Sequence, residues 1–144
     1  MRIMTLLAII TILLPMQARA QDCECEKQTV QEAIESSVAI ASGTIVNSKR
    51  RIYNSRDRME VKQQWKGEPK ETLVFQSEGA CDFRFKEGRE YLVFAHGDPS
   101  YGYLKVSVCS PTREVQDVSD KTWKALEASQ QAHILPVNPP GEAQ

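Results

Sequence analysis

The chain has 144 residues, of which 41% are hydrophobic and 26% are charged, and its formal net charge is −1 at pH 7. That length suits a single domain with a core of modest size. The basic residues are dispersed among acidic ones, so we do not expect nucleic acid as a partner, because nucleic-acid-binding domains concentrate cations.

The first twenty residues have the pattern of a secretory signal peptide. Met1-Arg2 is a short positive start, Ile3 to Leu14 is apolar apart from threonines, and Ala18-Arg19-Ala20 has small residues where a signal peptidase reads the chain. The apolar run is too short to remain as a membrane span, and no later stretch resembles one. We therefore expect cleavage after residue 20 and a secreted protein, either extracellular or periplasmic.

All four cysteines, Cys23, Cys25, Cys81 and Cys109, follow the predicted signal. An even number in an oxidising compartment predicts disulfides, for which three pairings exist. Cys23 and Cys25 are too close in sequence to bond each other easily, so each is expected to need a distant partner. The alternative is a zinc site of four thiolates, although this spacing differs from the usual pair of short knuckles.

Hydrophobic periodicity predicts a short amphipathic helix over residues 26–37, followed by β-structure. The expected strands span residues 38–46, 59–65, 72–76, 91–95 and 103–108. Gly43 predicts a bend or bulge within the first strand. Residues 47–56 are polar and basic, which is typical of an exposed hairpin loop.

After the strands the pattern becomes helical again. Asp117 or Ser119 is a suitable N-cap for a helix that continues through Leu126. Residues 133–144 are rich in proline and are expected to form a disordered tail, so the predicted domain spans residues 21–132. Five strands are too few for a typical sandwich. They suit a small closed barrel of the oligonucleotide/oligosaccharide-binding (OB) type.

Several sequence blocks follow the plan of a known family. They are Cys23-Glu24-Cys25, the strand that ends at 43–46, Trp65-Lys66-Gly67, Cys81, the segment 88–95 and Cys109-Ser110-Pro111-Thr112-Arg113. Together they resemble the N-terminal domain of tissue inhibitors of metalloproteinases and the wider netrin-like family. The resemblance runs from about Cys23 to Leu126. It implies a five-stranded OB barrel with flanking helices and the disulfides Cys23–Cys81 and Cys25–Cys109.

The resemblance also implies a function. In that family the N-terminal ridge enters the cleft of a zinc metalloprotease, and the free α-amino group and carbonyl of the first cysteine bind the zinc at its open coordination position. By this resemblance the ridge of the present chain inhibits a zinc metalloprotease, and it consists of Asp22, Cys23, Glu24, Cys25 and Glu26. The chain would then be a monomeric inhibitor rather than an enzyme, without a cofactor or a metal of its own.

One feature departs from the family pattern, because cleavage after Ala20 leaves Gln21-Asp22 ahead of Cys23. The nitrogen of Cys23 is then an amide, whose delocalised lone pair binds zinc poorly. In one hypothesis the Asp22 carboxylate replaces the missing amine as zinc ligand. In the alternative the domain is a non-inhibitory netrin-like binding module for an extracellular protein or an anionic glycan.

The basic residues of the predicted hairpin loop form a second candidate site. This basic patch consists of Lys49, Arg50, Arg51, Arg56 and Arg58. It is either a solvated hairpin tip or a site for an anionic glycan or an acidic partner.

Other polar and aromatic residues give weaker signals. His96 and His133 have no third ligand at metal spacing, which favours structural or exposed roles. The carboxylates near Cys81 are scattered and are expected to solvate a loop rather than act as an acid–base pair; they are Glu78, Asp82 and Glu87. The larger aromatic residues are expected in the core and in turns rather than on one binding face; they are Tyr53, Tyr101, Tyr103, Trp65 and Trp123.

Overall fold

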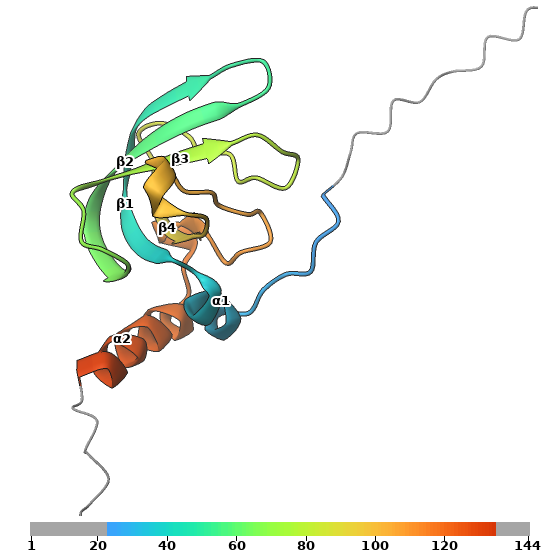
Figure 1. Ribbon diagram of the computed structural model, residues 1–144. Coiled ribbons are helices and arrows are strands. Elements are labelled where there is room, and N and C mark those ends of the chain that lie inside the picture. The colour runs from blue at the N-terminus through green and yellow to red at the C-terminus, as the bar shows by residue number, and fades with distance from the viewer. Residues whose placement is uncertain (1–22, 135–144) are drawn as a thin grey trace, which may run out of the picture.

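The protein is mainly β, with a five-stranded antiparallel open sheet and two α-helices (Figure 1). The computed structural model describes residues 23–134, so the predicted signal peptide, Gln21, Asp22 and residues 135–144 lie outside the described residues. The elements in chain order are α1 (Val30–Ser36), β1 (Ala39–Arg50), β2 (Ser55–Lys66), β3 (Thr72–Ser77), β4 (Glu90–Ala95), η1 (Pro99–Tyr101), β5 (Arg113–Glu114), η2 (Val115–Asp117) and α2 (Asp120–Ile134).

The long strand β1 is the centre of the sheet, whose strand order is β3-β2-β1-β4-β5. Its first half pairs with β4, from Ala39 opposite Ala95 to Thr44 opposite Glu90. Its pairing with β2 is longer and runs from Ile40 opposite Lys66 to Arg50 opposite Ser55. The register with β2 shifts between Ser42 and Gly43, which confirms the predicted irregularity at this glycine.

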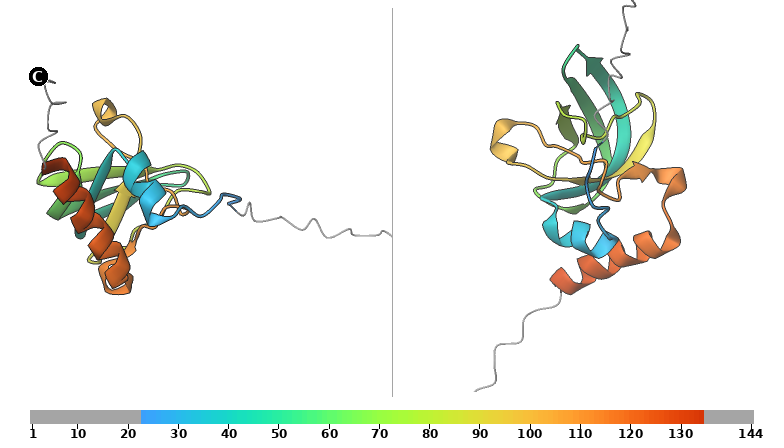
Figure 2. Two further views of the ribbon diagram at one scale, coloured as in Figure 1. Left: turned by 90° about the horizontal axis from the view of Figure 1, so that it is seen from below. Right: turned by 90° about the vertical axis from the view of Figure 1, so that its right-hand side faces the viewer.

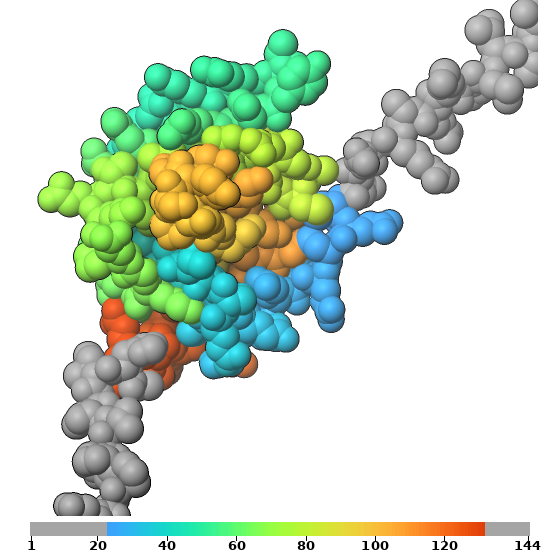
Figure 3. Space-filling model, viewed as in Figure 1, coloured from blue at the N-terminus to red at the C-terminus, as the bar shows by residue number. Residues whose placement is uncertain are grey.

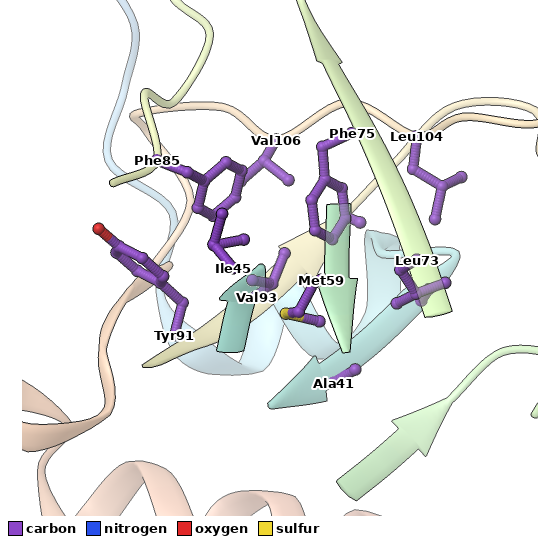
Figure 4. Packing of buried hydrophobic residues seen from close by; sticks show 12 residues of the cluster. Ala41, Ile45, Met59, Leu73, Phe75, Phe85, Tyr91, Val93, Leu104 and Val106 are labelled. Carbon is purple, nitrogen blue, oxygen red and sulfur yellow. The ribbon is translucent and has the colours of Figure 1, made fainter. Parts of the chain in front are cut away.

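The sheet separates two hydrophobic clusters, because alternate residues of a strand point to opposite faces. On β4, Tyr91 and Val93 belong to the larger cluster, whereas Leu92 and Phe94 belong to the smaller one. Figure 4 shows the larger cluster, where the aromatic rings of Phe75 on β3, Tyr91 on β4 and Phe85 in the loop between these strands pack together. In the smaller cluster the helices cover the other face of the sheet, below it in Figure 1 and across it in Figure 2.

The predicted strand over residues 103–108 is not a regular strand; the fifth strand is Arg113–Glu114 instead. The segment forms isolated bridges, in which Leu104 pairs with β3, Lys105 with His96, and Ser107 with Asp82. Because neighbouring residues change partner, no continuous ladder forms. The regular strands therefore leave the sheet open.

The predicted hairpin loop over residues 47–56 is also wrong, because β1 continues to Arg50 and β2 begins at Ser55. Only the turn between them, residues 51–54, lies outside strands. Asp57 explains how this polar stretch remains a strand: it is buried, and its carboxylate accepts hydrogen bonds from the hydroxyls of Ser48 and Ser55 at 2.5 and 3.2 Å. The inward residues are thus polar but satisfied.

Both helices were predicted, with different ends. The first begins at Val30 instead of residue 26, because Thr29 and Glu32 form a capping box there. The second begins at Asp120, and the Ser119 hydroxyl accepts from the N–H of Thr122 at 3.3 Å, as a cap does. It continues to Ile134, two residues into the segment predicted as a tail. No helix among residues 23–134 is long and apolar enough to cross a membrane.

Candidate functional site

The two disulfides attach the N-terminal segment to two loops of the domain. Cys23 bonds Cys81 and Cys25 bonds Cys109, with Cα–Cα distances of 5.0 and 6.0 Å. Both distances lie in the usual range for disulfides. This is the pairing that the family resemblance implies. Figure 3 shows the N-terminal segment along one side of the molecule, beside the loop that contains Cys81.

Hydrogen bonds make one platform of the loops that hold the segment. The N–H of Val108 donates to the carbonyl of Cys81 at 2.8 Å, which joins the two cysteine-bearing loops. Farther along the segment, the Gln28 N–H donates to the Cys109 carbonyl at 2.9 Å, and the Lys27 ammonium donates to the Val108 carbonyl at 2.8 Å. Both N-terminal cysteines are therefore fixed relative to the same rigid base.

The part of the segment between these attachments faces solvent. Glu24, Cys25 and Glu26 are exposed, and Cys23 is half-buried. Among the described residues, neither Glu24 nor Glu26 has an ion-pair partner. Within the same range, Cys23 to Lys27 make no backbone–backbone hydrogen bond. The ridge thus offers two free carboxylates and a backbone outside regular secondary structure, with open donors and acceptors. Asp22, predicted as part of it, lies outside the described residues.

The loop before Cys81 is braced by its own carboxylates. The Asp82 carboxylate accepts hydrogen bonds from the N–H groups of Glu78 and Gly79 at 2.6 and 2.9 Å. The Glu78 carboxylate accepts from the Gln76 amide and pairs with the Lys105 ammonium at 3.2 Å. These two contacts, the Gln76 hydrogen bond first, lower the pKa of Glu78 below its ordinary value. The loop is therefore a fixed neighbour of the ridge.

Glu87, the third carboxylate that the sequence places near Cys81, has a different role. It accepts a hydrogen bond from the backbone N–H of Ser48 at 3.0 Å. It braces the base of the β1–β2 hairpin rather than the Cys81 loop. The structure thus gives each of these three acids a hydrogen-bonding role in the fold.

The sulfur atoms of Cys23, Cys25 and Cys109 lie within 4.8 Å of one another. A zinc site needs such proximity, but it also needs thiolates. Here every cysteine of the chain is in a disulfide. The cluster is therefore two adjacent disulfides, which is the first of the two alternatives that the sequence left open.

All residues of the predicted basic patch are exposed, but they belong to strand ends and a turn rather than to one loop. Lys49 lies directly opposite Arg56 in the β1–β2 register, and Arg58 follows on the same face of β2. Arg50 turns to the other side, where its guanidinium donates to the Phe85 carbonyl at 3.3 Å. Among residues 23–134, no hydrogen bond or ion pair joins the patch to the ridge.

The aromatic residues do not gather on one binding face. Trp65 and Trp123 pack together beside the smaller cluster, with ring centroids 5.6 Å apart. Tyr101 stacks on Tyr103 at 6.1 Å in the turn after β4. Tyr53 stands alone at the hairpin tip and is 84% exposed. This distribution over core and turns is the one that the sequence predicted.

His96 lies near the second disulfide, in the lining of a cavity of about 320 Å³ that also includes Cys25, Ser107 and Ser110. The backbone of His96 pairs with Lys105 in both directions at 2.9 Å, which gives this residue a structural role. His133 belongs to the last turn of α2. His96 and His133 thus lie in different parts of the fold.

Two features of the site were not anticipated from the sequence. The anchoring contacts of Lys27 and Gln28 have no sequence signal beyond their position after Cys25. The exposed pair Ile52 and Tyr53 did have a sequence signal, because two apolar residues between arginines are unusual in a polar hairpin turn. No protein-family model matches the chain, and no curated protein is significantly similar to it.

Proposed function

We propose that this chain is a secreted inhibitor of zinc metalloproteases, which places its N-terminal ridge in the cleft of the enzyme. The observation that carries the proposal is the Cys23–Cys25 segment, with Glu24 and Cys25 exposed, held by two disulfides on one hydrogen-bonded platform. A rigid, extended segment loses little conformational entropy when it binds, and rigidity of this kind increases affinity.

The fold supports the proposal if the sheet is regarded as an OB-type barrel. The N–H of Leu104 donates to the Val74 carbonyl at 2.8 Å, and its carbonyl accepts from the Gln76 N–H at 2.9 Å, so Leu104 extends the β3 edge. The next residue, Lys105, exchanges two backbone hydrogen bonds with His96 just after β4. We propose that this segment is the short closing strand of the barrel that the family resemblance implies.

The open backbone of the ridge suits a protease cleft. Proteases commonly bind substrate as an extended strand, through main-chain hydrogen bonds with pockets for alternate side chains. Residues 23–27 have unpaired backbone groups among the described residues, and the exposed Glu24 lies in sequence between two disulfide-bonded cysteines. In this proposal Glu24 enters a specificity pocket, and the neighbouring 78–82 loop contacts the rim of the cleft.

The terminal chemistry decides how the ridge reaches the zinc of the target. A free amine on Cys23 would be a good ligand for the open zinc position, whereas an amide nitrogen would not. If Gln21-Asp22 remain, the carboxylate of Asp22, directly before Cys23, would take the place of the amine as zinc ligand. The binding-module alternative applies if neither form inhibits.

The test begins with the secreted protein, whose N-terminus is determined by mass spectrometry. Inhibition is then measured against a panel of zinc metalloproteases for forms that start at Gln21 and at Cys23, and for Asp22→Ala and Glu24→Lys. We expect Glu24→Lys to change the inhibition constant of a sensitive enzyme by at least about tenfold, because it reverses the charge in a pocket.

The matched control is Glu127→Lys, which makes the same charge change at an exposed position of α2. It should inhibit like the unaltered protein. Absence of inhibition by both N-terminal forms would refute the proposal and favour the binding module. Loss of inhibition in Asp22→Ala alone, in the form that starts at Gln21, would identify the carboxylate as the zinc ligand.

A further inference from the structure

The turn of the β1–β2 hairpin exposes two adjacent apolar side chains. Ile52 is 90% exposed and Tyr53 is 84% exposed, the highest values among large hydrophobic residues of the described chain. The turn is ordered by the Arg51 N–H, which donates to the Asn54 carbonyl at 2.7 Å. Single exposed apolar residues are normal, but an adjacent pair at a projecting tip indicates a surface that is covered when the protein functions.

The sheet leaves this tip free to reach a flat surface. The last backbone pairs at this end are Arg50 with Ser55 in the hairpin and Ser55 with Ser77 on β3. Only the turn, residues 51–54, extends past them, and Figures 1 and 3 show it standing out from the body of the molecule. Contact with a planar partner would therefore meet Ile52 and Tyr53 first.

Cations surround the apolar tip. Residues 47–58 contain five of the 18 basic residues and one of the 19 acidic ones, which gives a formal charge of +4 in a chain of net charge −1. Within the described residues none of these cations has a carboxylate partner. The one acid, Asp57, is 1% exposed and is held by serine hydroxyls.

The arrangement of these cations reduces the stability of the hairpin. Lys49 and Arg56 are directly opposite each other on neighbouring strands, and like charges in that position destabilise a hairpin. Among the described residues these cations have no carboxylate partner, and such an arrangement is best explained by an anionic partner that neutralises it.

We propose that the hairpin tip docks on an anionic phospholipid surface. Ile52 and Tyr53 enter the interfacial layer, where a tyrosine ring is apolar and its hydroxyl remains hydrated, while Lys49, Arg51 and Arg56 contact lipid phosphates. The apolar tip is what favours lipid over an anionic glycan, because a glycan would neutralise the cations but would leave Ile52 in water. This inference does not depend on protease inhibition.

The test is co-sedimentation of the purified secreted protein with vesicles of phosphatidylcholine that contain about one third phosphatidylglycerol, a composition that gives a strongly negative surface. We expect binding that weakens with added salt and is absent on pure phosphatidylcholine. The double substitution Ile52→Ser/Tyr53→Ser should weaken binding at least tenfold through lost burial. The double substitution Lys49→Gln/Arg56→Gln should weaken it by at least about tenfold through lost charge.

The matched control for charge is Lys121→Gln/Lys124→Gln, which neutralises two exposed cations of α2. It should bind vesicles like the unaltered protein, and circular dichroism checks that every variant is folded. No binding to anionic vesicles would overturn the proposal. Full binding by the Ile52→Ser/Tyr53→Ser variant would also overturn it, since the tip would then not insert. Binding to heparin without binding to vesicles would assign the patch to an anionic glycan.

Discussion

The hydroxyl of Thr112 accepts a hydrogen bond from the backbone N–H of Phe94 at 2.9 Å. Strand β5 pairs with β4 only at Tyr91 and Leu92, so the threonine hydroxyl satisfies a donor that β5 does not reach. Thr112 is buried and its hydroxyl also lies 2.9 Å from that of Ser110. Two of the sequence blocks described above, 88–95 and 109–113, are therefore in direct contact.

Removal of this acceptor should destabilise the domain. Thr112→Val keeps the shape of the side chain but leaves the buried N–H of Phe94 without a partner, at a cost of about 1–3 kcal/mol. Thr112→Ser keeps the acceptor and should cost less. Urea unfolding followed by circular dichroism measures both variants, and equal stability of Thr112→Val and the unaltered protein would show that water replaces the hydroxyl.

Gly43 is required where β1 approaches its neighbour β2 closely. A Cβ at this position would lie 2.9 Å from the Glu60 carbonyl carbon and 2.9 Å from Cγ of Met59, in addition to contacting the Glu60 oxygen. Backbone cannot yield as a flexible side chain does, so Gly43→Ala should cost about 3 kcal/mol. Gly79→Ala is the control, because a Cβ there would meet its nearest atom at 3.8 Å. Thermal unfolding should separate the two variants clearly, and similar midpoints would contradict the close approach of the two strands at Gly43.

These contacts show which parts of the fold local sequence can specify. The strand that contains Gly43 and the helix that contains Leu126 were both predicted from local sequence. The extension of β1 and β2 through residues 47–58 depends on Asp57, whose buried carboxylate is satisfied by partners nine residues before it and two residues before it. Periodicity reports apolar burial and has no signal for such a polar interior.

The candidate site likewise has features that the sequence can predict and features that only the tertiary structure reveals. The pairing of Cys23 with Cys81 follows from a family resemblance, because four cysteines alone permit three pairings. The bridges around Leu104 and Lys105 join segments that have no local pattern in common, so only the tertiary structure reveals them. Exposure of Ile52 likewise depends on where the hairpin turn falls.

Both disulfides close long loops and should contribute strongly to stability. The bonded cysteines are 58 residues apart in Cys23–Cys81 and 84 residues apart in Cys25–Cys109. In the chain-entropy model each bond stabilises the fold by about 4 kcal/mol. The variant Cys25→Ala/Cys109→Ala should lose most of that amount in denaturant unfolding. It should also expose the Gln28 N–H, whose acceptor is Cys109, to faster hydrogen exchange. Unchanged exchange at Gln28 would mean that hydrogen bonds alone hold the ridge.

The ion pair between Glu78 and Lys105 gives the loop beside the ridge a pH dependence. The pKa of Glu78 is lowered from 4.5, by the Gln76 hydrogen bond first and then by Lys105. The pKa of Lys105 is raised from 10.5, mainly by the hydrogen bond to Glu78.

A carboxyl group whose pKa is lowered by folding stabilises the fold when the pH is above the ordinary pKa of that group. This stabilisation is lost as the pH falls through the lowered pKa of the folded state. An ammonium group whose pKa is raised by folding stabilises the fold when the pH is below the ordinary pKa of that group. This stabilisation is lost as the pH rises through the raised pKa of the folded state. The Glu78–Lys105 pair therefore stabilises the loop fully between about pH 4.5 and pH 10.5. Lys105→Gln should raise the pKa of Glu78 toward 4.5 without reaching it, because the Gln76 hydrogen bond remains. NMR titration of the Glu78 carboxyl measures this, with Lys121→Gln as a distant control. A Glu78 pKa that does not move in Lys105→Gln would show that the pair does not persist in solution.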